Sequence, residues 1–142
     1  MVVIDGNGIV LGRLAASVAK RLLGGESVTI INAERLIVSG DPKSVAEKYQ
    51  KRRWAKDKAN PEHSPHWPRK PELLVRRVVR GMLPFKSVRG RSAFRLLRVV
   101  RGAPPELAFS AQKPLDERAA AGKLRGRFTS IAELCRRLGY AG

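Results

Sequence analysis

The arginines in the middle of the sequence are the side chains best suited to bind a ligand. Each guanidinium presents a planar fork of donors that matches phosphate oxygens, and it keeps its charge under any cellular condition. Arginine in such numbers therefore favours contact with phosphates or stacked bases over a simple role in solubility. The candidate contact residues, including the lysines and the tryptophan that accompany the arginines, are Lys51, Arg52, Arg53, Trp54, Lys56, Arg69, Lys70, Arg76, Arg77, Arg80, Lys86, Arg89, Arg91, Arg95 and Arg98.

The positive charge is concentrated in one part of the chain. Lys and Arg number 29 against 12 Asp and Glu among 142 residues, a formal net charge of +17, and residues 51–101 hold 16 of the basic and 3 of the acidic side chains. A surplus of this size needs an anionic partner, and its concentration predicts a contact surface. Charge alone leaves open nucleic acid, an anionic membrane surface and an acidic protein.

Two tryptophans lie inside this basic stretch. Trp54 and Trp67 could each stack on an unpaired base, as recognition of single-stranded RNA often requires. The alternative, which we favour, is that both anchor their segment to the folded domain. For the arginines the alternative is a solvated helix surface, but their concentration in residues 51–101 favours contact with RNA.

A glycine-rich turn near the amino terminus invites comparison with a dinucleotide-binding fingerprint. Gly6 and Gly8 fit the pattern, but the third glycine is Gly12, one residue too late, because Leu11 stands at the required position. The acidic residue expected after the second strand is also missing, since Asn32 stands there. We therefore predict no nucleotide cofactor.

Other catalytic or metal-binding arrangements are also incomplete. His63 and His66 lie in a proline-broken segment with Glu62 as the nearby acid, whereas a metal site needs three or four preorganised ligands. Cys135 is the single cysteine, which excludes an internal disulfide, and its apolar surroundings predict a core residue rather than a reactive thiol. We expect no metal, no small-molecule substrate and no enzymatic activity.

The first third of the sequence predicts an α/β unit. Residues 2–4 and 27–31 have the composition of strands, and apolar residues recur at helical spacing over 11–22, before Gly24 and Gly25. A strand, helix and strand at this spacing imply a parallel pair with a right-handed crossover. A further short strand is predicted over 36–38. The expected fold is a single α/β domain with a small, mainly parallel sheet flanked by helices.

The basic residues 51–101 are predicted to lie on helices and on an extended arm. Asp41 and Pro42 are typical of a helix start, and this helix runs into residues 51–54. Residues 55–71 hold four prolines and show no periodicity, which predicts an extended arm. A helix over 73–83, a basic turn over 85–91, a short helix over 91–98 and an apolar strand at 99–100 are expected to follow.

A helical wheel separates two faces of the helix over 73–83. At about 100° per residue, Arg76, Arg77 and Arg80 lie together on one side. The opposite side is apolar and predicts contact with the core; it consists of Leu74, Val75, Val78, Val79 and Met82.

The remaining chain is less informative until its last helix. Residues 106–127 have weak periodicity, whereas Ser130 and Glu133 form a capping box for a helix that stops at Gly139. We expect one domain over 1–142, with an α/β unit (1–54), the arm (55–71), basic helices and a strand (72–105), and a tail with the terminal helix (106–142). No apolar run approaches the roughly 18 residues that a membrane span requires, and no signal peptide is evident, so we expect a cytoplasmic protein without a membrane partner.

Several motifs resemble the universal large-subunit ribosomal protein L13 family. The most specific is Val79-Arg80-Gly81-Met82-Leu83-Pro84, followed by Lys86 and Arg89-Gly90. Val10-Leu11-Gly12-Arg13-Leu14-Ala15 and Ile31-Asn32-Ala33-Glu34, continued to Ser39-Gly40, are similar to other landmarks of that family in the same order. The resemblance spans residues 2 to 104. The arm with Arg69-Lys70-Pro71 and the terminal helix are more similar to archaeal and eukaryotic members than to bacterial ones.

The resemblance implies a parallel-sheet domain embedded in large-subunit ribosomal RNA, beside other large-subunit proteins. It further implies a structural and assembly role that supports translation, without catalysis. Val100 stands where we would expect an aromatic residue, and 106–127 matches no segment of the family that we can name. Strand packing near residue 100 and the contacts of the tail therefore stay open.

Two other functions compete with a structural role in the ribosome. A regulatory module could hold a messenger RNA or a protein complex away from the ribosome with the same basic surface. A small nucleotide-dependent enzyme would need to bind its nucleotide at residues 6–12. Sedimentation with the large subunit distinguishes the first alternative, and calorimetry with nucleotides distinguishes the second.

Overall fold

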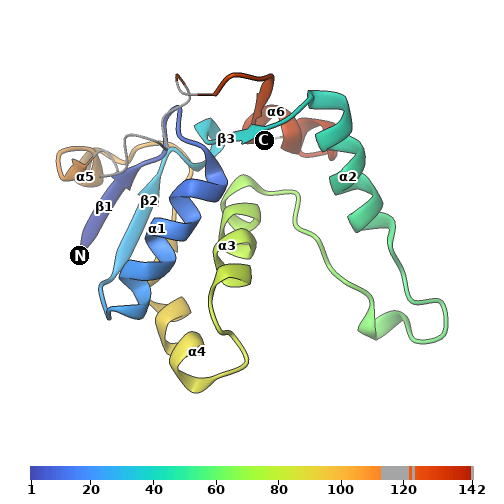
Figure 1. The fold of residues 1–142 in the computed structure, drawn as a ribbon, viewed down its shortest axis with the longest axis horizontal. Coiled ribbons are helices and arrows are strands. Elements are labelled where there is room, and N and C mark those ends of the chain that lie inside the picture. The colour runs from blue at the N-terminus through green and yellow to red at the C-terminus, as the bar shows by residue number, and fades with distance from the viewer. Residues whose placement is uncertain (113–121, 123, 142) are drawn as a thin grey trace.

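A four-stranded parallel sheet lies at the centre of the fold in the computed structural model, which describes residues 1–112, 122 and 124–141. Strand β1 (Val2–Asp5) pairs with β2 (Val28–Ile31), and β2 pairs with β4 (Leu97–Val99). The two-residue strand β5 (Ala111–Gln112) lies on the other side of β1, so the described order is β4-β2-β1-β5, parallel throughout (Figure 1). The predicted α/β fold with a small, mainly parallel sheet is confirmed.

Helix α1 (Leu11–Leu23) connects the two central strands. Its inward residues, which include Leu14, Val18 and Leu22, are almost completely buried, as the helical spacing predicts. The helix ends at Gly24, and Gly25 has a φ of +88°, a left-handed conformation that side chains rarely adopt. The chain can therefore reverse at once into β2.

Helix α3 (Pro71–Met82) packs beside α1 over the same face of the sheet (Figure 1). Leu74, Val75 and Val79 have no exposed surface, which confirms most of the predicted core face. Met82 is 42% exposed, so its predicted place in the core is wrong. The helix ends there, and the core side is continued by Leu83, which is 6% exposed.

The segment after α3 differs from the prediction in its boundaries. Helix α4 covers Val88–Arg95 rather than 91–98, because Ser87 caps it by accepting a hydrogen bond from the Gly90 N–H at 3.1 Å. Part of the predicted basic turn is therefore helical. Arg98 lies on β4 instead of a helix, and the Val100 N–H extends the strand pairing by donating to Ile30 O at 2.9 Å.

A second, two-stranded sheet ties the tail to the middle of the chain. Strand β3 (Ile37–Ser39) pairs antiparallel with β6 (Phe128–Ser130), a strand that the weak periodicity of the tail did not predict. Helix α6 (Ile131–Arg137) follows immediately. Short helix α5 (Pro105–Ala108) crosses the predicted start of the tail at residue 106, whereas residues 113–121 and 123 are outside the described residues.

Of the two hydrogen bonds of the predicted capping box at α6, the one accepted by the Ser130 side chain forms, and the one from the Glu133 carboxylate back to Ser130 does not. Ser130 Oγ accepts from the Glu133 N–H at 3.2 Å, but the Glu133 carboxylate accepts from Thr129 Oγ1 at 3.2 Å and from Arg137 at 2.8 Å. Ile131, Leu134 and Cys135 are fully buried in the same apolar core as α1 and α3. The terminal helix is thus an integral part of the core.

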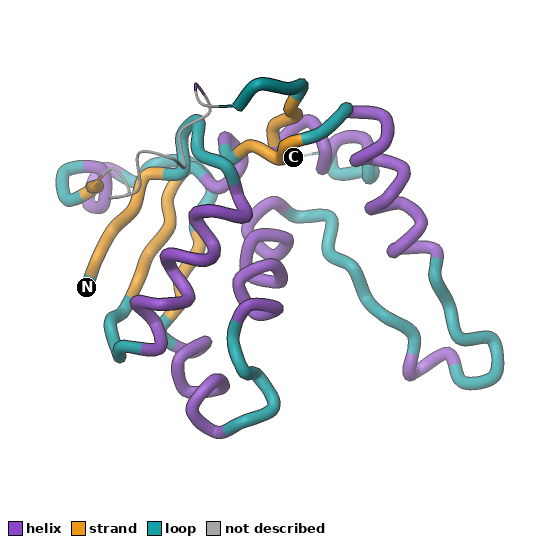
Figure 2. The backbone as a smooth tube through the Cα atoms, in the orientation of Figure 1, coloured by secondary structure: helices purple, strands orange, loops and turns teal. Residues whose placement is uncertain are grey.

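Helix α2 (Pro42–Trp54) and the arm project to one side of the sheet and of helices α1 and α3 (Figure 2). Asp41 caps α2 by accepting from the Lys43 N–H at 3.2 Å, as predicted. The predicted arm is non-helical except for a 3-10 turn over Pro61–His63, and its last residue, Pro71, is the first residue of α3. Within the described residues, no helix is long and apolar enough to cross a membrane.

Burial makes the Cys135 thiol a poor acid, as expected of a core cysteine. Burial, assisted by the negative charge of Glu72, raises the pKa of Cys135 to about 12. We expect the native chain to react with iodoacetamide at mildly alkaline pH far more slowly than the chain unfolded in guanidinium chloride. Because the folded thiol retains its proton, this group also makes the free energy of unfolding fall as pH rises from 9.0 toward about 12. Equal labelling rates would contradict the burial of this side chain.

Candidate nucleic-acid interface

The predicted contact residues are distributed over six segments of the chain. Arg53, Arg76 and Arg77 are half-buried, and the others are exposed. Their positions are α2 for Lys51, Arg52, Arg53 and Trp54, the arm for Lys56, Arg69 and Lys70, α3 for Arg76, Arg77 and Arg80, the following turn for Lys86, and α4 or β4 for Arg89, Arg91, Arg95 and Arg98.

Trp67 brings an arginine from α2 together with one from α3. The guanidinium carbon of Arg77 lies 4.2 Å from the Trp67 ring centroid, and that of Arg52 lies 5.0 Å from it. Tyr49 meets the same ring edge-on at a centroid distance of 5.9 Å. Arg77 also donates a hydrogen bond to His66 O. These contacts fix the end of the arm against both helices.

The other two arginines of α3 are also stacked on aromatic rings. Arg76 lies 5.1 Å from the ring centroid of Phe94, and Arg80 lies 4.1 Å from that of Phe85. The two phenylalanines contact each other edge-on at 5.5 Å. Each guanidinium of the arginine face therefore has an aromatic support: Trp67 of the arm for Arg77, Phe94 of α4 for Arg76, and Phe85 of the turn for Arg80.

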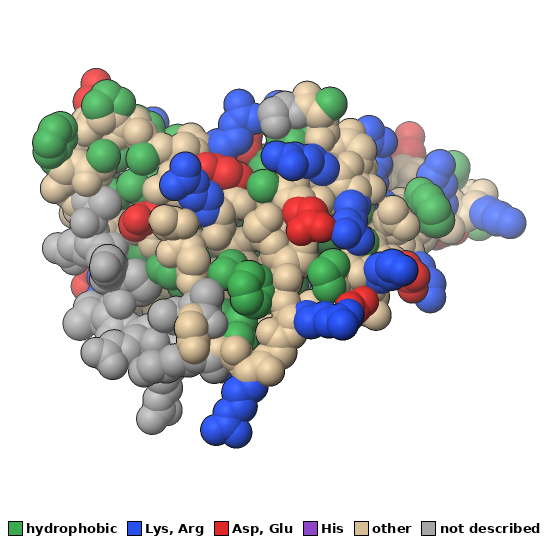
Figure 3. Space-filling model, turned by 90° about the horizontal axis from the view of Figure 1, so that it is seen from above, with side chains coloured by type: hydrophobic (Ala, Val, Ile, Leu, Met, Phe, Trp, Pro, Cys, Tyr) green, Lys and Arg blue, Asp and Glu red, His purple; other side chains and the backbone are tan. Residues whose placement is uncertain are grey.

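Aromatic contact leaves the charge of these arginines unneutralised. Within residues 1–112, 122 and 124–141, the ion pairs are Arg127 with Asp41 at 3.2 Å and Arg137 with Glu133 at 2.8 Å, and neither uses a cation of residues 51–101. Acidic side chains are interspersed among the basic ones where α6 lies (Figure 3). Burial lowers the pKa of Arg77, and the charges of Arg80 and Arg52 lower it further. An anion bound here would relieve that repulsion.

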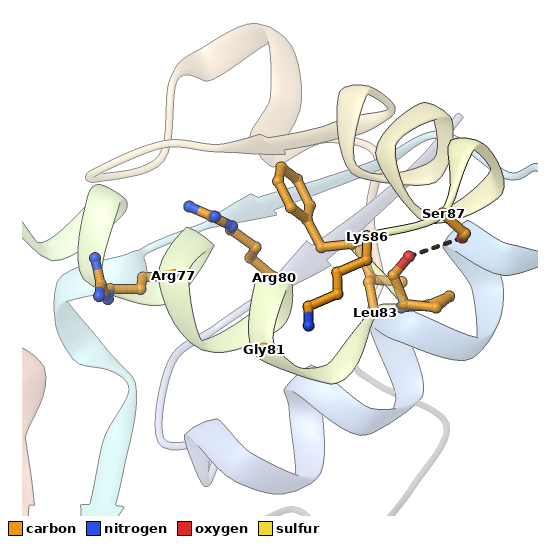
Figure 4. Close-up of a pocket in the computed structure, with 8 residues that line it drawn as sticks. Arg77, Arg80, Gly81, Leu83, Lys86 and Ser87 are labelled. Atoms are coloured by element: carbon orange, nitrogen blue, oxygen red, sulfur yellow. Dashed lines mark hydrogen bonds between the residues drawn. The ribbon is translucent and has the colours of Figure 1, made fainter. Parts of the chain in front are cut away.

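The last turn of α3 and the chain after it enclose a groove of about 720 Å³. Leu83, Pro84 and Phe85 supply its apolar surface, and Arg77, Arg80 and Lys86 supply its charge. Lys86 extends from the turn back alongside α3, on which the two arginines are carried (Figure 4). We call this hollow the α3 groove. It combines an apolar floor with three cations.

Some predicted contact residues have structural partners instead of joining the groove. Arg53 Nη1 donates to Leu138 O at 3.2 Å, and Arg89 Nη2 donates to Leu23 O at 3.3 Å. Both oxygens belong to the carboxyl-terminal ends of helices, where cations are favourable. Arg69 lies beside Gly139, where its Nη1 would be 3.6 Å from an added Cβ. Arg53 and Arg89 thus help to hold the fold, whatever else they contact.

The family model for ribosomal protein L13 matches residues 1–106. This range includes strands β1, β2 and β4 of the parallel sheet and all residues that line the α3 groove. The chain belongs to the ribosomal protein L13 family. Large ribosomal subunit protein uL13 of Archaeoglobus fulgidus is 42% identical over 142 residues, covering 99% of this chain and 88% of that protein. The protein of the same name from Methanocaldococcus jannaschii is 39% identical over 140 residues, covering 98% of each.

Membership in the L13 family confirms the resemblance predicted from the motifs, including its archaeal character. The protein of this name from Methanosphaera stadtmanae is 48% identical over 106 residues, covering 74% of this chain and 75% of that protein. The relatives are ribosomal proteins rather than enzymes, in agreement with the prediction that this chain is not an enzyme.

The glycine-rich turn has a structural use in this L13-family chain. A Cβ at Gly6 would lie 2.9 Å from Ile31 O, and Gly8 has a φ of +69°. Asn32, which also has a positive φ of 54°, donates from Nδ2 to Asp5 Oδ1 at 2.8 Å. The glycines thus let the end of β1 approach the end of β2. In the described part of the chain, no three His, Cys, Asp or Glu side chains are grouped to hold a metal ion.

Phe85 and Phe94 are site residues that the sequence interpretation missed. Both lie within the basic stretch, as the tryptophans do, and this shared position was the available signal. Of the tryptophans, Trp67 has the predicted anchoring contacts, whereas Trp54 is 73% exposed and makes no ring contact among the described residues. The anchoring predicted for Trp54 is therefore wrong, and its stacking on a base stays a prediction.

Replacing Trp67 with Ala should release the arm of the free L13-family chain. The variant removes the ring shared by Arg52 and Arg77, so trypsin should cleave after Lys56 and Lys58 several-fold faster, because proteolysis follows the population of locally opened chain. Trp54→Ala is the matched control and should leave the cleavage rate unchanged, since that side chain is exposed. Equal rates in the two variants would show that Trp67 does not anchor the arm.

Proposed function

We propose that this chain is a structural component of the large ribosomal subunit and that it binds ribosomal RNA through phosphates. The observation that carries this proposal is the α3 groove, which Arg77, Arg80 and Lys86 line without an acidic ion-pair partner among the described residues. Arginine forks match phosphate oxygens, and aromatic supports fix the forks before RNA arrives. The relatives are named as proteins of the large ribosomal subunit.

The groove is the proposed centre of a wider contact surface over residues 51–101. Flanking contacts come from α2, the arm, α4 and β4, and neighbouring large-subunit proteins cover other parts of the chain. In this proposal the protein acts in the cytoplasm, supports assembly of the subunit, and uses the whole of residues 1–142 as one unit. The proposed RNA contacts are Lys51, Arg52, Arg53, Trp54, Lys56, Arg69, Lys70, Arg76, Arg77, Arg80, Lys86, Arg89, Arg91, Arg95 and Arg98.

The salt dependence of binding tests the phosphate contacts. Affinity for a transcript of large-subunit ribosomal RNA should fall steeply with salt, because each contact releases counterions and contributes about 0.9 to the slope of log K against log salt. Lys56→Gln should lower that slope by about 1 without changing the thermal unfolding of the protein, because the side chain is exposed. Lys20→Gln, an exposed change on α1, is the control and should leave the slope unchanged. An unchanged slope for Lys56→Gln would remove the arm from the interface.

Sedimentation tests the assignment to the large subunit. A tagged copy of the chain should sediment in stoichiometric amount with large subunits on a sucrose gradient. A pool confined to the light fractions would contradict the proposal and would favour a regulatory module that acts away from the ribosome.

A further inference from the structure

The α3 groove has a floor whose shape is fixed by its neighbours. Ser87 Oγ donates to Pro84 O at 2.8 Å and accepts from the Gly90 N–H at 3.1 Å, so the turn and the start of α4 are joined. Leu83 is buried, and the Phe85 ring is held edge-on by Phe94. The apolar surface is therefore present before any partner binds, rather than being formed by it.

The lining of the groove requires a ligand with two properties. Its cations, Arg77, Arg80 and Lys86, call for negative charge, whereas the exposed Pro84 and the half-buried Phe85 call for a flat or apolar group. Duplex RNA offers its phosphates and sugars to the outside but keeps its bases stacked and paired. A duplex alone would satisfy the cations and leave the apolar floor facing water.

The geometry points to a single unpaired nucleotide of the RNA as the occupant of the α3 groove. Its phosphates lie among the three cations, and its base stacks on the Phe85 ring or on the guanidinium of Arg80, which lies over that ring at 4.1 Å. Aromatic rings and guanidinium planes are the usual stacking partners of unpaired bases in proteins. This inference rests on the proposed function, and it adds the kind of RNA feature that the groove selects.

A comparison of two RNAs tests the inference. The probes are a blunt RNA duplex and the same duplex with one unpaired nucleotide at its centre, both measured by fluorescence anisotropy with the full chain. The bulged RNA should bind about tenfold more tightly, the size expected for stacking of one base. Phe85→Leu should abolish the difference in affinity between the two RNAs. Loss of the ring that supports Arg80 can lower both affinities alike, but the salt slope on the duplex should be kept, because the change removes a ring and no charge.

Two further variants make the outcome decisive. Phe109→Leu, at a side chain that is 95% exposed outside the groove, should keep the full preference for the bulge. Arg80→Lys keeps the charge but removes the stacking plane, so it should also weaken the preference for the bulged RNA. If Phe85→Leu lowers the melting temperature, Arg80→Lys replaces it as the test. Equal affinity of the wild-type chain for both RNAs would overturn the inference, and so would tighter binding of an acidic, phenylalanine-containing peptide. If the duplex itself shows no salt-dependent binding, the proposed function fails as well.

Discussion

Replacement of Gly90 with Ala is expected to lower the free energy of unfolding by about 3 kcal/mol or more, the upper part of the range for overpacked sites. A Cβ there would lie 2.1 Å from Pro84 O and 2.4 Å from Pro84 C, and both are backbone atoms that cannot rotate away. Helix α4 would have to move off the turn that it covers, which would break the hydrogen bonds of Ser87 to Pro84 O and Gly90 N. Urea unfolding of the two proteins, followed by circular dichroism, measures the change.

Gly81→Ala is the matched control for this effect. Gly81 lies within α3, and an added Cβ would meet no atom within 4 Å. Its replacement should raise stability by about 0.5–1 kcal/mol, because alanine favours the helix more than glycine does. If both variants lost a similar amount of stability, close packing at Gly90 would not be the cause.

The second large effect is expected from reversing the charge of the arginine face. Changing Arg76, Arg77 and Arg80 together to Glu should weaken binding to ribosomal RNA by at least about a thousandfold at moderate salt, because each charged hydrogen bond is worth about 1.5–3 kcal/mol. The slope of affinity against salt should also become flatter, since fewer counterions are released. Filter binding over a range of salt concentrations measures both quantities.

A control with the same change in net charge separates local contact from general repulsion. Lys20, Lys43 and Arg136 are exposed and lie outside residues 51–101. Their replacement with Glu should weaken binding much less than the change on α3. Comparable losses in the two triple variants would mean that the arginine face makes no specific contact, and thermal unfolding checks that each variant remains folded.

Sequence patterns were sufficient where an element carries its own signal. Helix α1 has a long apolar period, and α2 has both a capping Asp41 and Pro42 at its first turn, so their positions could be predicted. Strands β5 and β6 are two and three residues long and exist through their pairing with β1 and β3. Neither has the apolar run that predicted the short strands over 2–4 and 36–38. Helix α4 was misplaced because its apolar residues are few and the cap at Ser87 was overlooked.

In the candidate site too, features that depend on neighbouring residues could be predicted, and contacts between distant segments could not. The arginine face of α3 followed from helical spacing, because Arg76, Arg77 and Arg80 are close in sequence. The stack of Arg52 and Arg77 on Trp67 joins α2, the arm and α3, and such a contact depends on how these segments pack. The groove could not be predicted either, since it requires the turn at Leu83 and Phe85 to fold back beside the helix.

The position of α6 in the core has a consequence for the order of folding during synthesis. Ile131 donates its N–H to Leu36 O at 2.8 Å, although 95 residues separate the two, and its side chain is fully buried. Closing so long a loop costs chain entropy and slows folding. A nascent chain that has made all of α3 still has an open cavity where Ile131, Leu134 and Cys135 will insert. Its apolar core therefore stays incomplete until α6 has been made and packs against α2 and α3.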